Sequence, residues 1–309
     1  MCIRDRSIAA IAIYVGAAVP RFVDSERQRR WISDAFSSYI SPNLVEHLIE
    51  NPNELSLGGE RRECSFVLTD LAGFTSLVEQ SDPAAIAELL NDYLEGMVKI
   101  AFHYDGTLDR IVGDAVAVMF SAPIEQSDHA ERAVLCARAM DEFASAFALE
   151  RGSVERPLGP TRIGVNTGMV TVGNFGGGAM FDYRALGDPI NTAARLESAN
   201  RHLGTRVCVS GSTVALCSEF HGRPIGELWL VGKAEGIIAY EPLPPAQASS
   251  EHIREYLKAF ALLEQGRSSE ALGAFEALQA SVPDDGLVAF HLERLRSGDQ
   301  GARIEFSEK

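Results

Sequence analysis

The chain has 309 residues, of which 46% are hydrophobic and 23% are charged, a composition that suits a folded globular protein rather than a disordered one. Its formal net charge of −15 argues against a nucleic-acid partner, because binding to a phosphate backbone needs basic patches. The five cysteines form no C-x-x-C pair, which favours buried thiols in a reducing compartment over a disulfide framework or a zinc site.

The N-terminal segment contains an unbroken apolar run, IAAIAIYVGAAV at 8–19, shorter than the roughly 20 residues that a helix needs to cross a bilayer. Four arginines follow it before residue 31, as on the cytoplasmic side of membrane helices. We interpret residues 1–20 as the residual part of a membrane helix whose beginning is lost, and residues 21–60 as linker or signalling helices. This predicts a cytoplasmic catalytic domain tethered to the inner (plasma) membrane. The alternative is a buried or interfacial helix of a soluble protein.

Residues 61–243 read as one compact block of strands and helices. CSFVLTD predicts a strand, and a long helix follows with Asp82 as its N-cap and Pro83 in its first turn. GTLDRIVGDAVAVMF predicts two short strands around a turn at Gly113. A second amphipathic helix, two strands, a third helix ending at Gly204 and three closing strands complete the block. This order predicts an α+β fold, a ferredoxin-like (palm-type) sandwich with helices on one face of an antiparallel-rich sheet.

A polar linker, PPAQASS, separates this block from residues 251–298. That segment predicts a helical hairpin joined at Gly266, with a further helix after it, similar to one tetratricopeptide-type repeat. Because a single repeat rarely stands alone, we expect it to pack on the main domain or on a partner.

Two aspartates lie where buried strands normally exclude charge. Asp70 ends the strand FVLTD and precedes a small-residue loop into a helix, and Asp114 follows Gly113 directly before an apolar strand. Each alone is best explained as a strand-end cap or turn former. As a facing pair, the two carboxylates would repel each other unless a cation lies between them, so the pair predicts a divalent-metal site. The helix N-terminus after Asp70 offers backbone N–H groups that suit phosphate oxygens.

A third segment, DYRALGDPINTAARLESAN, places Asn191 and Arg195 four residues apart, hence on one helix face. An amide beside a rigid guanidinium suits a ribose or a phosphoryl group that changes charge. The alternative is a surface arginine that pairs with Glu197 or Asp188.

The motifs FVLTDLAGFT, GDAVAVMF and GDPINTAARLE, in this order and spacing from about Arg61 to Pro242, resemble the class III nucleotidyl cyclases, the adenylyl and guanylyl cyclase family. The preceding stretch RRWISDAFSSYISPNLVEHLIENPNELSLGGERRE is similar to the linker of bacterial members that lie below a CHASE2 sensor. That sensor is absent from this sequence.

The resemblance implies a head-to-tail homodimer that converts ATP to 3′,5′-cyclic AMP with two Mg²⁺ or Mn²⁺ ions per active site. Asp70 and Asp114 match the metal-binding aspartates, while Asn191 and Arg195 match the ribose-orienting and phosphorane-stabilising residues, reaching in from the other subunit. The implied phosphate-binding residues are Leu71, Ala72, Gly73, Phe74, Thr75 and Lys233, although an exposed turn lysine is the alternative for the last of these.

The purine-reading positions depart from the family pattern. Arg110 stands where adenylyl cyclases usually have lysine and guanylyl cyclases glutamate, and Arg184 stands where adenylyl enzymes usually have Asp, Thr or Ser. Arginine only donates hydrogen bonds, so this chemistry does not exclude GTP. Arg184 could instead turn away and pair with Asp182 or Asp188. We expect an adenylate cyclase that acts in signal transduction. The alternatives are a guanylate cyclase and a catalytically silent nucleotide-binding regulatory module.

Overall fold

The computed structural model describes residues 44, 45, 47, 58–152, 158–177, 180–230 and 232–306. The chain divides into two compact units, 1–55 and 56–309, and in the first unit the described residues are helical. The expected membrane helix at 1–20 and nearly all of the linker at 21–60 lie outside the described residues. No helix within the described ranges combines the length and the apolarity that crossing a membrane requires.

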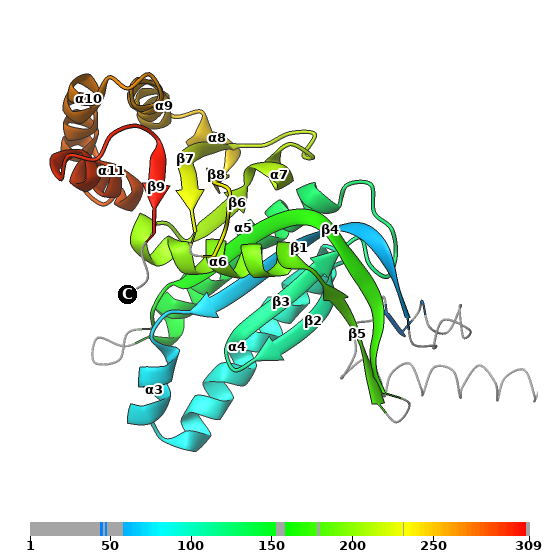
Figure 1. The fold of residues 1–309 in the computed structure, drawn as a ribbon. Helices are drawn as coiled ribbons and strands as arrows, with labels where there is room; N and C mark the ends of the chain where they lie inside the picture. Colours follow the sequence, from blue (N-terminus) through cyan, green and yellow to red (C-terminus); the bar gives the residue numbers. More distant parts are fainter. Residues whose placement is uncertain are drawn as a thin grey trace, which may run out of the picture. The chain divides into compact units, whose positions relative to one another are not determined.

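Within the described residues, the second unit is built on one nine-stranded sheet (Figure 1). The strands are β1 (Gly58–Leu71), β2 (Thr107–Val112), β3 (Ala115–Phe120), β4 (Thr161–Gly177), β5 (Met180–Leu186), β6 (Val207–Ser210), β7 (Gly222–Trp229), β8 (Ile237–Pro242) and β9 (Arg303–Glu305). Their order is β2-β3-β1-β4-β6-β8-β7-β9, and β5 pairs with β4 off this path. The pairs β4–β6 and β7–β9 are parallel and the others are antiparallel, which confirms the antiparallel-rich α+β prediction.

The helices are α3 (Phe74–Gln80), α4 (Pro83–His103), α5 (His129–Arg151), α6 (Asp188–Leu203), α7 (Gly211–Val214), α8 (Pro245–Ala248), α9 (Glu251–Glu264), α10 (Ser268–Ser281) and α11 (Gly286–Arg296). The predicted start of α4 is confirmed, since the Asp82 carboxylate accepts from two amides of its first turn at 3.1 Å. Gly204 ends α6 in the left-handed conformation, at a φ of 68°.

The long helices cover both faces of the sheet, which corrects the expectation of helices on one face. Val67 of β1 belongs to the core that α4 and α5 form, whereas its neighbour Phe66 belongs to the core with Ile190 and Ala193 of α6. Successive side chains of a strand point to opposite faces, so a strand covered on both sides reads as a continuous apolar run. The run SFVL in β1 has this property, and sequence alone did not say which helix covers which face.

The C-terminal segment 251–306, here named the C-terminal module, contains α9, α10, α11 and β9. Its helices lie together at one end of the sheet (orange to red in Figure 1), and β9 pairs with β7. Its aromatic residues Tyr256, Phe260 and Phe275 share one buried cluster with residues of α6, β7 and β8. The predicted boundaries at 61–243 and 251–298 stay predictions, and both segments lie in the same compact unit.

Candidate active site

The two predicted metal-binding aspartates come together at the end of β1. Asp70 is the penultimate residue of β1, and Asp114 lies in the β2–β3 turn after Gly113, whose φ of 62° gives the tight reversal. The Asp114 carboxylate accepts a hydrogen bond of 2.8 Å from the backbone N–H of Leu71, the residue after Asp70. The antiparallel pairing of β1 with β3 brings this turn beside the end of β1. A local turn and one strand pairing therefore unite carboxylates that are 44 residues apart in the sequence.

The electrostatics of this pair suit a cation. Burial raises the pKa of the Asp70 carboxyl, and the nearby Asp114 raises it further. Arg162 of β4 opposes this rise, and its guanidinium lies 3.7 Å from the Asp70 carboxylate. The described residues contain no cluster of three or more His, Cys, Asp or Glu side chains with metal-binding geometry. A divalent cation here would therefore take further oxygen ligands from backbone carbonyls, water or a bound substrate, as Mg²⁺ commonly does.

The predicted phosphate-binding loop lies directly after Asp70. The amide of Leu71 is already bound to Asp114, and the amide of Ala72 donates to the carbonyl of Pro160 at 3.1 Å. Gly73, in the left-handed conformation at a φ of 77°, precedes α3, and the first amides of a helix have no intrahelical partner. In this loop, the backbone donors still available for a phosphate are those at the start of α3, at positions 73–75.

The third predicted segment, residues 182–200, forms the end of β5 and most of α6, and the predicted Lys233 lies in the loop before β8. Asn191 is exposed on this helix, and Arg195, one turn further, is half-buried. The Nη1 atom of Arg195 is buried and has no hydrogen-bond partner within the described part of the chain. The guanidinium packs beside Gly232, and the adjacent Lys233 forms an ion pair with Asp188 at the start of α6. A buried guanidinium nitrogen without a partner fits a missing anionic group.

The alternative for Arg195, a surface arginine that pairs with Glu197 or Asp188, is not what the structure shows. Asp188 pairs with Lys233, and the Glu197 carboxylate accepts from the Ser198 hydroxyl at 3.0 Å. In the described ranges, neither acid pairs with Arg195. Lys233 is also not a freely exposed turn lysine, because only 16% of its side chain is accessible.

The two purine-reading candidates each pair with a neighbouring acid. The Nε of Arg110 donates to Asp109 at 2.8 Å, and Arg184 forms an ion pair with Asp182 at 2.8 Å. Each arginine side chain is 41% exposed. Of the two partners considered for Arg184, the structure selects Asp182, because Asp188 is taken by Lys233. The two arginines stand on β2 and β5, strands that contact each other directly.

Two charged residues at this site, Arg162 and Glu197, were not predicted to line it. Arg162 stands directly opposite Asp70 in the β1–β4 register. Glu197 of α6 lines a cavity of about 200 Å³ together with Asp70, Arg110 and Ala194. Glu197 is only 9% exposed; burial, followed by the charge of Asp70, raises its pKa to about 7, although the Ser198 hydrogen bond and the charge of Arg162 oppose this rise.

No sequence motif marks Arg162, because its role depends on the register of two distant strands. For Glu197, the available signal was an acid at helical spacing from the apolar residues Ile190 and Ala193 of the third helix.

Comparisons with known proteins agree with this geometry. Residues 59–240 match the model of the "Adenylate and Guanylate cyclase catalytic domain" family. "Adenylate cyclase 1" of Rhizobium meliloti is 33% identical over 207 residues, 67% of this chain and 31% of that protein. "Adenylate cyclase" of Anabaena cylindrica is 30% identical over 217 residues, 69% of this chain and 42% of that protein. The chain thus spans less than half the length of these two relatives.

Solved structures give the same result. The adenylyl cyclase CyaB from P. aeruginosa is 32% identical with a TM-score of 0.56, covering 63% of this chain and 100% of that chain. The guanylyl cyclase Cya2 is 30% identical with a TM-score of 0.54, covering 61% of this chain and 97% of that chain. Since the family model covers more than half of the chain, including every candidate site residue, this chain belongs to the adenylate and guanylate cyclase catalytic-domain family, the class III nucleotidyl cyclases.

Proposed function

We propose that this chain converts ATP to 3′,5′-cyclic AMP and pyrophosphate, at active sites shared between two copies of the chain, as an enzyme of signal transduction. The observation that carries the proposal is the Asp70–Asp114 pair at the end of β1, held together through the Leu71 amide inside a cyclase fold. The family match makes cyclisation of a nucleoside triphosphate the expected chemistry, and the site residues support it individually.

In this proposal Asp70 and Asp114 would hold two Mg²⁺ or Mn²⁺ ions, which would lower the pKa of the 3′-hydroxyl and neutralise charge on the triphosphate. The amides at the start of α3 donate to phosphate oxygens, assisted by Lys233. Asn191 orients the ribose, and Arg195 stabilises the negative charge that grows on the α-phosphate in the transition state. The 3′-oxygen forms its bond to the α-phosphorus as the bond to the pyrophosphate oxygen breaks, and the hydroxyl proton passes to solvent.

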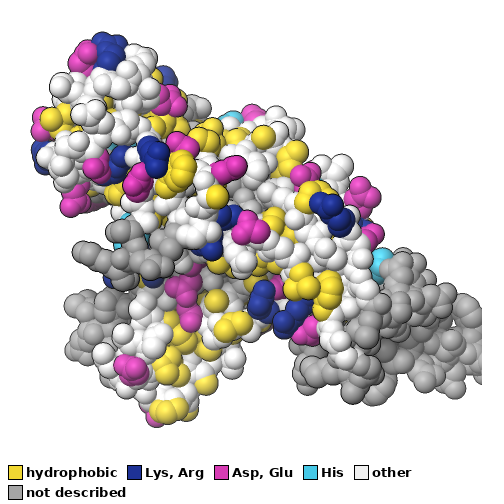
Figure 2. Space-filling view, viewed as in Figure 1, with side chains coloured by type: hydrophobic (Ala, Val, Ile, Leu, Met, Phe, Trp, Pro, Cys, Tyr) yellow, Lys and Arg dark blue, Asp and Glu magenta, His cyan; other side chains and the backbone are white. Residues whose placement is uncertain are grey.

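A head-to-tail homodimer explains why the site residues form two groups within one chain. Asp70 lines a cavity with Ala194 and Glu197 of α6, and neither Asn191 nor Arg195 lines that cavity. We infer that Asn191 and Arg195 serve the metal site of a second copy. Large apolar side chains that a second copy could cover are exposed on β2, β4 and β5, namely Ile111, Val112, Met169 and Leu186. Figure 2 shows hydrophobic side chains exposed among acidic and basic ones on one face of the molecule.

We propose ATP as the substrate because Arg110 carries the positive charge typical of the adenylyl type, opposite in sign to the glutamate of the guanylyl type. Cyclic GMP formation is the second candidate, because both purine-reading positions carry only donors. On the sequence of residues 8–30 alone, we also propose that the catalytic domain is cytoplasmic and tethered to the inner membrane.

The test is turnover of ATP and GTP in parallel by the purified full chain with Mn²⁺, comparing wild type with Asp70→Ala. A matched control is Asp299→Ala, which removes an exposed aspartate of the C-terminal module. Cyclic AMP formed by wild type and the control but not by Asp70→Ala supports the proposal. Formation of cyclic GMP alone would identify GTP rather than ATP as the substrate. Absence of either product from a dimeric sample would favour a silent nucleotide-binding module.

A further inference from the structure

Helix α6 carries the two candidate transition-state residues, and its second half is packed into the C-terminal module. Leu196, Ala199 and Leu203 of α6 belong to the same buried cluster as the aromatic residues of α9 and α10. Leu196 is fully buried and is the direct neighbour of Arg195. The module therefore helps to determine where the Arg195 backbone lies.

Where the end of α6 meets the module, the backbones of Gly204 and Gly286 are in close contact. A Cβ atom on Gly286, the first residue of α11, would lie 2.3 Å from the carbonyl oxygen of Gly204, the C-cap of α6. Contacts below 3.0 Å force a shift, and here the neighbouring atom is backbone rather than a flexible side chain. Gly286 does not have a positive φ, so an alanine suits its conformation and only the space is missing.

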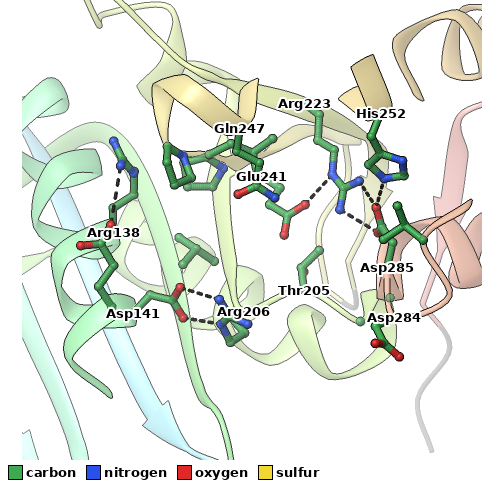
Figure 3. A pocket seen from close by; sticks show the side chains of 18 residues that line it. Arg138, Asp141, Thr205, Arg206, Arg223, Glu241, Gln247, His252, Asp284 and Asp285 are labelled. Carbon is green, nitrogen blue, oxygen red and sulfur yellow. Dashed lines mark hydrogen bonds and ion pairs between the residues drawn. The ribbon is translucent and has the colours of Figure 1, made fainter. Parts of the chain in front are cut away.

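The start of α11 is bound to the sheet through the Asp285 side chain, so it has little freedom to move (Figure 3). Asp285 caps α11 by accepting from the Val288 amide at 3.2 Å. Arg223 of β7 donates to both Asp285 carboxylate oxygens at 2.6 and 2.8 Å, and His252 of α9 lies 2.7 Å from one of them. Arg223 also binds Glu241 of β8 at 2.6 Å.

The Arg223–Asp285 ion pair, here named the ionic joint, is almost completely buried. Only 6% of the Arg223 side chain and 7% of the Asp285 side chain are accessible, and the guanidinium lies 4.7 Å from the ring centre of Tyr256. Burial opposes ionisation of Asp285, yet the hydrogen bonds from Arg223 hold its pKa at about 2. Removing one partner of a buried pair leaves the other charge uncompensated, so the joint is rigid and sensitive to substitution.

We propose that Gly286 is a positioning residue for the cyclase reaction, through which the C-terminal module sets the location of α6 and therefore of Asn191 and Arg195. The inference rests on the proposed function of those two residues. A bulkier residue at 286 pushes on the end of α6, because α11 is held by Asp285 and Arg223. Displacement of a catalytic group by about 1 Å can lower a rate by about a hundredfold. Arg195 acts on the transition state, so the effect falls on kcat rather than on KM.

The first experiment compares wild type with Gly286→Ala and with Gly273→Ala as a matched control. Gly273 lies in α10 of the same module, where a Cβ would meet no atom within 4 Å. Gly286→Ala should lower kcat by about ten- to a hundredfold while KM for the triphosphate changes less than about threefold. Gly273→Ala should keep both constants at the wild-type value. A folded Gly286→Ala variant with wild-type kcat, or with losses confined to KM, would overturn the inference.

Hydrogen exchange of the α6 amides gives a readout that does not depend on turnover. Gly286→Ala should exchange faster than wild type over 190–200, and Gly273→Ala should not. If Gly286→Ala fails to fold, Asp285→Asn keeps the side-chain shape, weakens the ionic joint and should change kcat and exchange in the same direction to a smaller extent. If wild type makes no cyclic nucleotide, the proposed function fails, whereas the exchange data still decide whether the module positions α6. Unchanged α6 exchange in both variants would refute that link.

Discussion

His291 of α11 is a polar side chain in an apolar environment. We expect the protein to be measurably less stable with this histidine than with a leucine in its place. It is fully buried, and the rings of Tyr256, Phe260, Phe275 and Phe290 surround it at centroid distances between 5.2 and 6.2 Å. Neither ring nitrogen has a hydrogen bond of normal geometry in the residues that the structure describes. A buried polar group left without a partner costs about 1–3 kcal/mol. We therefore expect His291→Leu to raise the free energy of unfolding at pH 7.5 by about 1–2 kcal/mol.

The same burial makes the effect depend on pH. Burial lowers the pKa of His291 from 6.5 to about 3, and the charges of Arg294 and Arg223 act in the same direction, while the Ile225 backbone and Asp285 oppose them. Between pH 6.5 and about 3 the unfolded state binds a proton that the folded state does not, so stability falls as the pH decreases. One pH unit below 6.5 costs about 1.4 kcal/mol. The advantage of His291→Leu over wild type should therefore grow by about 1.4 kcal/mol between pH 7.5 and 5.5.

The assay is urea unfolding of wild type and His291→Leu at pH 7.5 and pH 5.5, with the free-energy difference taken at each pH. His103→Gln is the control, because it also removes a histidine but at an exposed position at the end of α4. If the difference between His291→Leu and wild type is the same at both pH values, His291 is not a neutral, buried group in the folded protein, and the reasoning is refuted.

Three further substitutions and one labelling experiment test other parts of the molecule. Asn200→Leu should destabilise the fold by about 2–4 kcal/mol in urea unfolding, because the buried amide makes four hydrogen bonds at the end of α6; wild-type stability would contradict this. Lys233→Ala should raise KM for the triphosphate at least about tenfold, through loss of a charge-assisted hydrogen bond, and an unchanged KM would remove it from the phosphate site. Arg110→Glu should increase the ratio of cyclic GMP to cyclic AMP formed, because a carboxylate accepts hydrogen bonds that arginine cannot; an unchanged ratio would exclude it from base selection. In a Cys2→Ser background, Cys217 should react with a thiol reagent at pH 8 only slowly, because burial raises its pKa to about 11, and fast labelling of the native protein would contradict this.

The part of the site that sequence predicted depends on local chain geometry. The turn at Gly113 and the strand end at Asp70 follow from short-range patterns of glycine, acid and apolar residues. Their convergence needed only one strand pairing, which the order of elements suggested. The helix start at Asp82 and the helix end at Gly204 were confirmed for the same reason, since caps are encoded by residues next to the helix.

The features that sequence missed depend on distant pairing. Arg162 is opposite Asp70 only because β1 and β4 pair in one specific register, and a shift by one residue would place it on the other face. The partner of Arg184 stayed open between two acids because the sequence did not show that Lys233 would take Asp188. Such choices depend on which side chains lie within reach of one another in the folded protein, and single-sequence patterns carry little information on that.

The packing of α6 suggests why a catalytic domain and a helical appendage form one compact unit. Ile190 and Ala193, in the first half of the helix, are buried in the core on the β1–β4 side, whereas Leu196 and Leu203 are buried in the core shared with the C-terminal module. Arg195 lies at the boundary between these two cores. A helix held at both ends can present a guanidinium at a fixed place with little reorganisation, which is what stabilisation of a transition-state charge requires. Changes in the packing of the module should therefore reach the Arg195 guanidinium through the helix itself, without any contact between the module and the nucleotide.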